Sequence, residues 1–264
     1  RAADRTYAIN VLLAVVYPFL PDLIFFENQD QFEDKVIYHE ESSHHSITIT
    51  QWMDEYWLYL DELKNLSTID EFLYYEPFAH PAALLVDKPG RVLIMGGENG
   101  CLARELLKYP DLERIDLVPY DSVLLDLGKT HPVLTDMNDS SLHDMKVHLL
   151  STPVLSYVVS GEYTYDLIFA DLPDPRNLET NQFYTLEFYS YLAELLALNG
   201  LFITQSGSPY FATRAFMAID STMQEAGFNT LPLHNQILTL GEWGWIIGSQ
   251  NMSSVALKDK MLAF

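Results

Sequence analysis

The sequence predicts an α/β protein: a mostly parallel sheet with helices on both faces, preceded by a small antiparallel β domain. From Arg91 onward, strand-like and helix-like segments alternate, which is typical of parallel sheets. Before that point, β-branched and aromatic runs are joined by short polar links, which favours antiparallel strands. The chain has 264 residues, of which 48% are hydrophobic, enough for one large domain with a small one attached.

The chain is strongly acidic. It holds 37 Asp and Glu against 15 Lys and Arg, a formal net charge of −22. Such a charge argues against nucleic acid as a partner and favours small cationic molecules. The single cysteine, Cys101, cannot form an internal disulfide or a cysteine-based zinc site. The histidines show no metal-ligand spacing, so no metal is predicted.

Residues 1–26 form an apolar N-terminal segment. The uncharged run from Tyr7 to Leu20 is shorter than the roughly 20 residues that span a bilayer, and Pro18, Pro21 and Asp22 interrupt its continuation to Phe26. Three interpretations stay open: a helix docked on the body, the remnant of a membrane segment, or a dimer contact. Because the chain begins with Arg1 rather than Met, we expect a fragment or a processed piece of a longer protein.

Residues 27–70 are predicted to form the small β domain. Runs at 35–39, 46–50 and 56–60 alternate like strands and indicate about three antiparallel strands. The second domain, 71–264, opens with a predicted helix over 71–86, in which two prolines are expected to distort or interrupt the helix.

The next stretch combines a short buried strand, Val92 to Met95, with a turn and a helix that ends before Pro110. The turn consists of Gly96, Gly97, Glu98, Asn99 and Gly100. Such a turn brings bare backbone and a helix N-terminus against a ligand. The acid Glu98 would repel a phosphate, so a nucleoside carrying a positive charge, such as a sulfonium, suits the turn better. A tight turn with no ligand remains the alternative.

The later elements continue the alternation. We expect further strands at 114–118, 145–150, 167–170 and 201–204, and helices between them, three of which begin at Ser122, Leu186 and Phe211. A final pair of strands, 237–240 and 245–248, closes the sheet. Ligands of such sheets bind at the carboxyl ends of the strands.

Two acids follow the strand that begins at Tyr165. Asp171 lies at its carboxyl end, and Asp174 follows in a loop stiffened by Pro173 and Pro175. Two carboxylates in this arrangement can bind an ammonium group, and one can accept its proton. A turn or capping role is the alternative for each acid alone.

Four motifs together resemble the spermidine synthase (polyamine aminopropyltransferase) family: Gly96–Gly100, Arg104–Pro110, Asp171–Pro175 and Phe183–Tyr189. Three more are similar to the branch whose synthase domain follows a membrane-spanning region: Thr130–Leu134, Ser208–Ala212 and Gly241–Gly244. The resemblance runs from about Val36 to Gly248, and the combined motifs are far more specific than the glycine turn alone.

The resemblance implies a seven-stranded methyltransferase-like (Rossmann-like) domain behind the small β domain, usually in a homodimer. It implies transfer of an aminopropyl group from decarboxylated S-adenosylmethionine, a co-substrate, to putrescine or a related amine in polyamine (spermidine) biosynthesis, with no cofactor and no metal. It implies a cytoplasmic protein, or a membrane-associated one held through its N-terminal segment.

The resemblance also implies site residues. Asp171 matches the proton acceptor, Asp174 the amine-binding acid, and Tyr74 the tyrosine that accompanies both. The nucleoside-binding positions correspond to Gly96, Gly97, Glu98, Asn99, Gly100, Asp121 and Thr152.

Several of these positions depart from the family pattern. Asn99 stands where an acid is usual, Pro119 replaces the ribose-binding acid, Thr152 the adenine-reading Asp, and Tyr75 a histidine. Glu98 or Asp121 can take over the ribose after a small shift. A second interpretation is therefore a degenerate, non-catalytic member (a pseudoenzyme) that acts as scaffold, subunit or polyamine sensor. A methyltransferase on the same fold is disfavoured by the two acids of the loop.

Overall fold

A computed structural model of the chain describes residues 29–263. The apolar segment 1–26, with its three interpretations, lies outside the described residues. The chain forms two compact units that divide between Ile69 and Asp70. Within residues 29–263, no helix has the length and the apolar character that crossing a bilayer requires.

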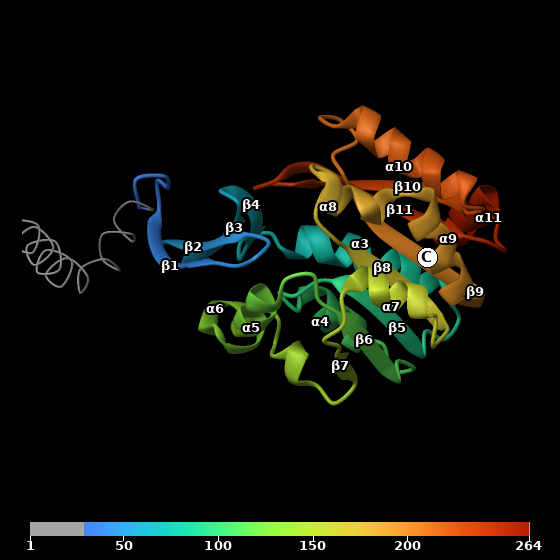
Figure 1. The fold of residues 1–264 in the computed structure, drawn as a ribbon, viewed down its shortest axis with the longest axis horizontal. Helices are drawn as coiled ribbons and strands as arrows, with labels where there is room; N and C mark the ends of the chain where they lie inside the picture. Colours follow the sequence, from blue (N-terminus) through green and yellow to red (C-terminus); the bar gives the residue numbers. More distant parts are fainter. Residues whose placement is uncertain (1–28, 264) are drawn as a thin grey trace, which may run out of the picture. The chain divides into compact units, whose positions relative to one another are not determined.

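The first unit is a four-stranded antiparallel sheet in the order β1-β2-β3-β4 (Figure 1). Its strands are β1 (Lys35–Glu41), β2 (Ser46–Trp52), β3 (Glu55–Leu60) and β4 (Leu63–Ser67). The prediction of about three strands missed β4. The turn before β4 consists of Asp61 and Glu62, both with positive φ (52° and 64°). This is the geometry of a tight hairpin turn that usually carries Asn-Gly, so the residue types gave no turn signal.

The second unit is built on a seven-stranded sheet in the order β10-β11-β9-β8-β5-β6-β7, which confirms the predicted fold class. The strands are β5 (Arg91–Gly96), β6 (Arg114–Val118), β7 (Val147–Leu149), β8 (Tyr165–Asp171), β9 (Leu196–Gly207), β10 (Asn229–Ile237) and β11 (Gly241–Ser249). Strands β5 to β9 pair in parallel, and β11 runs antiparallel to both its neighbours.

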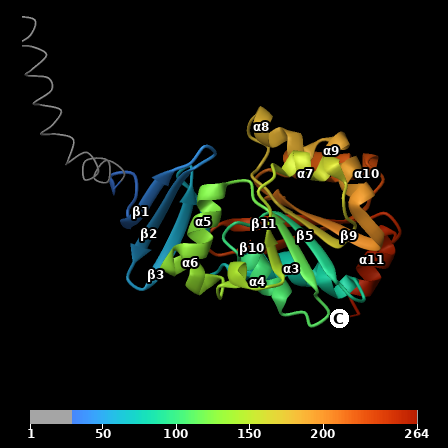
Figure 2. The same cartoon turned by 60° about the horizontal axis from the view of Figure 1, so that its bottom comes forward.

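Helices cover both faces of this sheet. They are α3 (Phe72–Leu85), α4 (Cys101–Leu107), α5 (Ser122–Thr130), α6 (Pro132–Met137), α7 (Val154–Ser160), α8 (Leu178–Asn181), α9 (Leu186–Leu195), α10 (Thr213–Glu225) and α11 (Ser254–Met261). Figure 2 shows α7, α9 and α10 on one face, and α3, α4 and α11 on the other. The short 3₁₀ segments η2 (Ser141–His143) and η3 (Gln182–Tyr184) complete the elements of this unit.

Helix α3 is continuous through Pro77 and Pro81, so the expected interruption was wrong. Each proline removes one backbone donor and so weakens the helix. The helix buries a largely apolar face, whose members include Tyr74, Tyr75 and Phe78. Burial of this face stabilises the helix enough to offset the lost donors, because packing dominates helix stability in proteins.

The expected strand at 237–240 was also wrong. Strand β10 ends at Ile237, and the next residues form the turn into β11, where Leu238 is 74% exposed. In the real strand, Asn229–Ile237, only Thr230 and Ile237 are buried, and the residues between them alternate partly buried with exposed. Its polar face includes His234 and Gln236, and the strand also contains a proline, so the residue types indicate a strand only weakly.

Candidate functional site

The predicted site begins where β5 and β8 end side by side. Gly96 pairs with Asp171 in the parallel ladder, and a Cβ atom on Gly96 would lie 2.1 Å from the Asp171 carbonyl oxygen. Only glycine allows this approach, and its φ of 78° is also one that glycine tolerates. The glycine turn and Asp171 therefore lie at one edge of the sheet.

Tyr74 of α3 donates a hydrogen bond from its hydroxyl to Oδ1 of Asp171, at 2.8 Å. Burial raises the pKa of the Asp171 carboxyl to about 6, against the lowering effect of that hydrogen bond. Burial, with the nearby charge of Asp171, also raises the pKa of Tyr74 well above its usual value. Tyr74 therefore stays a neutral donor. Asp171 is ionised at neutral pH but holds a proton more readily than an exposed aspartate does.

The second carboxylate oxygen of Asp171 points toward the glycine turn. A Cβ on Gly97 would lie 3.9 Å from Oδ2. No side chain or backbone amide of residues 29–263 donates a hydrogen bond to this Oδ2. An incoming ligand can therefore bind Oδ2 while Tyr74 holds Oδ1.

Aromatic rings enclose Tyr74. Its ring centroid lies 4.8 Å from that of Tyr75, 5.3 Å from Trp245 and 6.2 Å from Trp243. Trp245 is fully buried in the core, while Trp243 is partly exposed. These rings displace water from the Tyr74 side of Asp171, which is consistent with the raised pKa of that carboxyl.

Asp174 lies in the loop after β8 and is held by two side chains that the sequence analysis did not single out. Gln205 donates from Nε2 to Oδ1 of Asp174 at 3.2 Å, and Arg176 pairs through Nη2 with Oδ2 at 3.0 Å. The same Gln205 amide bonds the Leu172 carbonyl oxygen and the Tyr184 hydroxyl. Gln205 directly follows the predicted strand 201–204, so its place at a carboxyl end was the signal that could have identified it.

Glu98 turns inward from the glycine turn. Its Oε1 accepts hydrogen bonds from the backbone amides of Tyr120 and Asp121, the latter at 3.0 Å. Those amides lie just beyond Pro119, after the end of β6. Glu98 is 6% exposed, and burial raises the pKa of its carboxyl to about 7 despite the amide donors. A carboxyl group from the turn thus reaches the carboxyl end of β6.

The other predicted nucleoside residues have local partners. Asn99 donates from Nδ2 to the Tyr75 hydroxyl at 2.6 Å and accepts from the Cys101 amide at 3.0 Å. Asp121 caps α5 by accepting from the amides that follow it. Thr152 is exposed in the loop between β7 and α7. The structure therefore brings Glu98 and Asp121 together, whereas no hydrogen bond links the Thr152 side chain to another described site residue.

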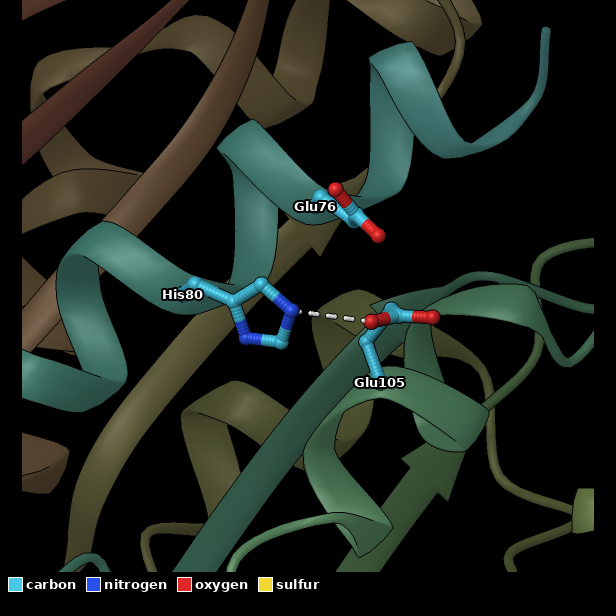
Figure 3. A group of neighbouring side chains, drawn as sticks. All are labelled: Glu76, His80 and Glu105. Carbon is cyan, nitrogen blue, oxygen red and sulfur yellow. Dashed lines mark ion pairs between the residues drawn. The ribbon is translucent and has the colours of Figure 1, made fainter.

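Within residues 29–263, one group of three side chains has the spacing to hold a metal ion: Glu76, His80 and Glu105, whose ligand atoms lie within 4.8 Å of one another (Figure 3). His80 Nε2 lies 2.9 Å from Oε2 of Glu105, and the Lys108 ammonium lies 2.6 Å from the same oxygen. The other Glu105 oxygen pairs with Arg104 at 2.9 Å. Lys108 and Arg104 thus pair with the two oxygens of this buried carboxylate, and a metal ion would compete with Lys108 for Oε2.

Residues 71–259 match the family model described as the spermine/spermidine synthase domain. The chain belongs to this family. The matched range contains the glycine turn, Tyr74 and both loop acids, so the whole predicted site lies in the part of the chain that defines the spermine/spermidine synthase family.

Curated relatives of the family agree with this assignment. The chain is 36% identical over 242 residues to a polyamine aminopropyltransferase of Oceanobacillus iheyensis, covering 92% of this chain and 47% of the relative. It is 32% identical over 248 residues to that of Leptospira interrogans, covering 93% and 50%. The chain therefore spans about half the length of the curated relatives it matches.

Two solved structures of spermidine synthases share the fold. One, a complex with the transition state analogue AdoDATO, has a TM-score of 0.78 at 24% identity, over 84% of this chain and 76% of that chain. The other, from Thermotoga maritima, has a TM-score of 0.76 at 25% identity, over 84% and 75%. The fold of this chain is thus one that solved spermidine synthases share.

Proposed function

We propose that the chain is a polyamine aminopropyltransferase: it transfers an aminopropyl group from decarboxylated S-adenosylmethionine to putrescine or a related amine. One observation carries the proposal. The Asp171 carboxylate lies at the carboxyl end of β8 beside the glycine turn, bound on one oxygen by Tyr74 and open to a ligand on the other. The relatives named polyamine aminopropyltransferase support the same reaction.

The reaction requires the amine nitrogen to be aligned with the methylene carbon and one proton to be removed from the amine. The amine nitrogen attacks the methylene carbon next to the sulfonium sulfur, the carbon–sulfur bond breaks, and neutral methylthioadenosine leaves with the electron pair. Sulfonium is a good leaving group, so binding the two reactants in line supplies much of the rate. The amine, with a reference pKa of about 10.4, must reach the carbon without its proton. In this proposal Asp171 accepts or relays that proton, and Tyr74 fixes the direction of its carboxylate.

On the nucleoside side, we assign the ribose to Glu98. Gly96, Gly97 and Gly100 offer bare backbone to the nucleoside. The position of the family's ribose-binding acid is Pro119, and Glu98 binds the two amides just after that proline. Its Oε1 is engaged there, so Oε2 is the atom that would accept from a ribose hydroxyl. The acid would thus reach the ribose from the first turn rather than from the second strand.

A second candidate function is a non-catalytic member that acts as scaffold, subunit or polyamine sensor. The amide of Asn99 supports it, because Asn99 is committed to Tyr75 and to the Cys101 amide and carries no charge for an ammonium. The exposed position of Thr152 offers no built contact for an adenine. Under this interpretation the amine-side acids persist while the nucleoside side is lost.

Calorimetry with methylthioadenosine separates the two candidates. Saturable binding, together with product formation that Asp171→Asn abolishes, would exclude the non-catalytic candidate. Absence of binding at millimolar methylthioadenosine would exclude the enzyme. Asp259→Asn, at an exposed position on α11, is a matched control, which should leave both readouts unchanged.

We extend the proposal to the whole protein on the strength of the resemblance. We propose a homodimer, with residues 1–26 as an apolar segment, 27–70 as the small β domain and 71–264 as the transferase domain. We place it in the cytoplasm, or at a membrane through the N-terminal segment, as in the branch whose synthase domain follows a membrane-spanning region. Light scattering on the purified chain tests the dimer, and flotation with lipid vesicles tests the membrane association.

A further inference from the structure

The two loop acids, Asp171 and Asp174, differ in the charge of the groups that bind them. Asp171 is bound by a neutral hydroxyl, from Tyr74, and has no cation partner among residues 29–263. Asp174 is bound by the neutral amide of Gln205 and by the guanidinium of Arg176, whose Nη2 lies 3.0 Å from Oδ2. The chain therefore presents one acid as an open anion and keeps the other paired with a cation of its own.

Arg176 is held next to Asp174 by the backbone. Its amide donates to the Asp174 carbonyl oxygen at 2.8 Å and to the Thr180 hydroxyl at 3.0 Å. Asn177 and Thr180 then form a capping box that opens α8. These hydrogen bonds fix the backbone of Arg176 next to Asp174. The Arg176 side chain is 59% exposed and can rotate away from Asp174.

We propose that Arg176 is a specificity-determining residue: a resident cation that occupies Asp174 and weakens the preference of the acceptor site for amines with a second ammonium group. The inference rests on the proposed function and on the match of Asp174 to the family's amine-binding acid. We take Asp174 to bind the distal ammonium group of the acceptor, while Asp171 faces the attacking amine. A diamine must displace the guanidinium to reach Asp174. A monoamine of equal length binds Asp171 alone and leaves Arg176 in place.

The solvent exposure of the Arg176–Asp174 ion pair sets the size of the expected effect on amine binding. A solvent-exposed ion pair is weak, and its removal changes an equilibrium by roughly 1.4- to 5-fold. Arg176 is more than half exposed and Asp174 is 26% exposed, so the pair belongs to this weak class. Its cation is therefore displaceable by substrate, yet strong enough to lower the affinity for a diamine measurably.

Calorimetry with putrescine and butylamine tests the proposal, using the full chain saturated with methylthioadenosine. Arg176→Gln should tighten putrescine binding by roughly 1.4- to 5-fold and leave butylamine binding unchanged. Arg214→Gln, which removes one positive charge from the exposed face of α10, is the matched control and should change neither. In an Asp174→Asn background, the added Arg176→Gln change should have no effect on putrescine. Circular dichroism melts check that each variant is folded.

The outcomes separate this inference from the proposed function. If the wild type binds putrescine and Arg176→Gln leaves that affinity unchanged or weakens it, the inference fails and the proposed function stands. If Arg214→Gln tightens putrescine as much as Arg176→Gln does, the effect is one of net charge and the inference again fails. If neither the wild type nor Arg176→Gln binds either amine, the proposed function fails and the inference with it.

Discussion

At the scale of single residues, the site depends on the pKa and the hydrogen-bond donors of two buried carboxyl groups. Asp171 and Glu98 both lie at the carboxyl edge of the sheet, and burial raises the pKa of each, to about 6 and about 7. Each keeps a donor on one oxygen: Tyr74 for Asp171, and backbone amides for Glu98. At neutral pH Asp171 is mostly ionised and Glu98 partly ionised, so the site carries negative charge. That charge attracts a cationic nucleoside and a cationic amine, the two reactants of the proposed reaction.

The Tyr74 hydroxyl can be tested through the pH profile. Its hydrogen bond favours the ionised form of Asp171 and so lowers the pKa of that carboxyl. Tyr74→Phe removes the donor, so the pKa of Asp171 should rise further, and the acidic limb of kcat/KM should move to higher pH. Steady-state rates between pH 5 and 9 measure this shift. A limb that stays in place would separate Tyr74 from the titration of Asp171.

Glu98 can be tested through stability. Its pKa rises from an ordinary 4.5 to about 7 on folding, so the folded state holds a proton that the unfolded state releases. Stability should therefore fall as pH rises from about 4.5 to 7, and stay reduced above that range. Glu98→Gln keeps an oxygen for the two amides but removes the charge. It should gain up to about 3 kcal/mol relative to the wild type at pH 8, with little difference at pH 4.

Urea unfolding at several pH values measures this difference. Glu187→Gln on the exposed first turn of α9 is the control, and it should change the free energy of unfolding by less than about 0.5 kcal/mol at any pH. A Glu98→Gln variant that is equally destabilised at pH 4 and pH 8 would mean that shape, not charge, governs this position.

At the scale of elements, patterns with strong local rules were predictable and those held by distant contacts were not. The β/α alternation from Arg91 onward identified the sheet, and the strand that delivers Asp171 was predicted directly. Gln205 was missed because its contact with Asp174 joins residues 31 positions apart, which only the fold brings together. Arg176 was missed although it lies two residues after Asp174, because its pairing depends on how the loop turns.

The contact between Asn99 and Tyr75 is a second feature that the sequence alone could not predict. The sequence shows two departures, Asn99 and Tyr75, far apart in the chain. The structure joins them in one hydrogen bond of 2.6 Å between α3 and the glycine turn. These two departures from the family pattern look independent in the sequence but form one contact in the structure. Neither residue alone indicates that contact.

The turn between β5 and α4 allows a prediction at this scale. Gly100 has a φ of 82°, and a Cβ on it would lie 2.8 Å from Asn138 Nδ2 and 2.9 Å from Leu142 Cγ. Gly100→Ala should therefore destabilise the fold by about 2–4 kcal/mol, from backbone strain plus overpacking. Gly227→Ala is the control, because Gly227 has a similar φ of 93° but nothing within 4 Å of an added Cβ. It should cost only the strain, about 1–2 kcal/mol. Equal melting temperatures for the two variants would rule out the crowding.

At the scale of the whole molecule, the excess of acids over bases sets the long-range field. A net charge of −22 attracts cations at distances where no single contact acts. The screening length falls from about 30 Å at 0.01 M salt to about 8 Å at 0.15 M, so this attraction is a low-salt effect. Contacts at Asp171 are short-range and buried, and salt should affect them less.

If this field acts on ligands, the salt dependence of binding should depend on the charge of the ligand and not on its shape. Raising salt from 0.01 to 0.15 M should weaken putrescine binding about twice as steeply, on a logarithmic scale, as butylamine binding, because putrescine carries two charges and butylamine one. Methylthioadenosine is neutral, so its affinity should stay within measurement error over the same range. Calorimetric titrations at four salt concentrations give the three slopes. If the slopes of the two amines coincide, their attraction comes from the single contact at Asp171 and the acidic surface has no part in recognising the acceptor.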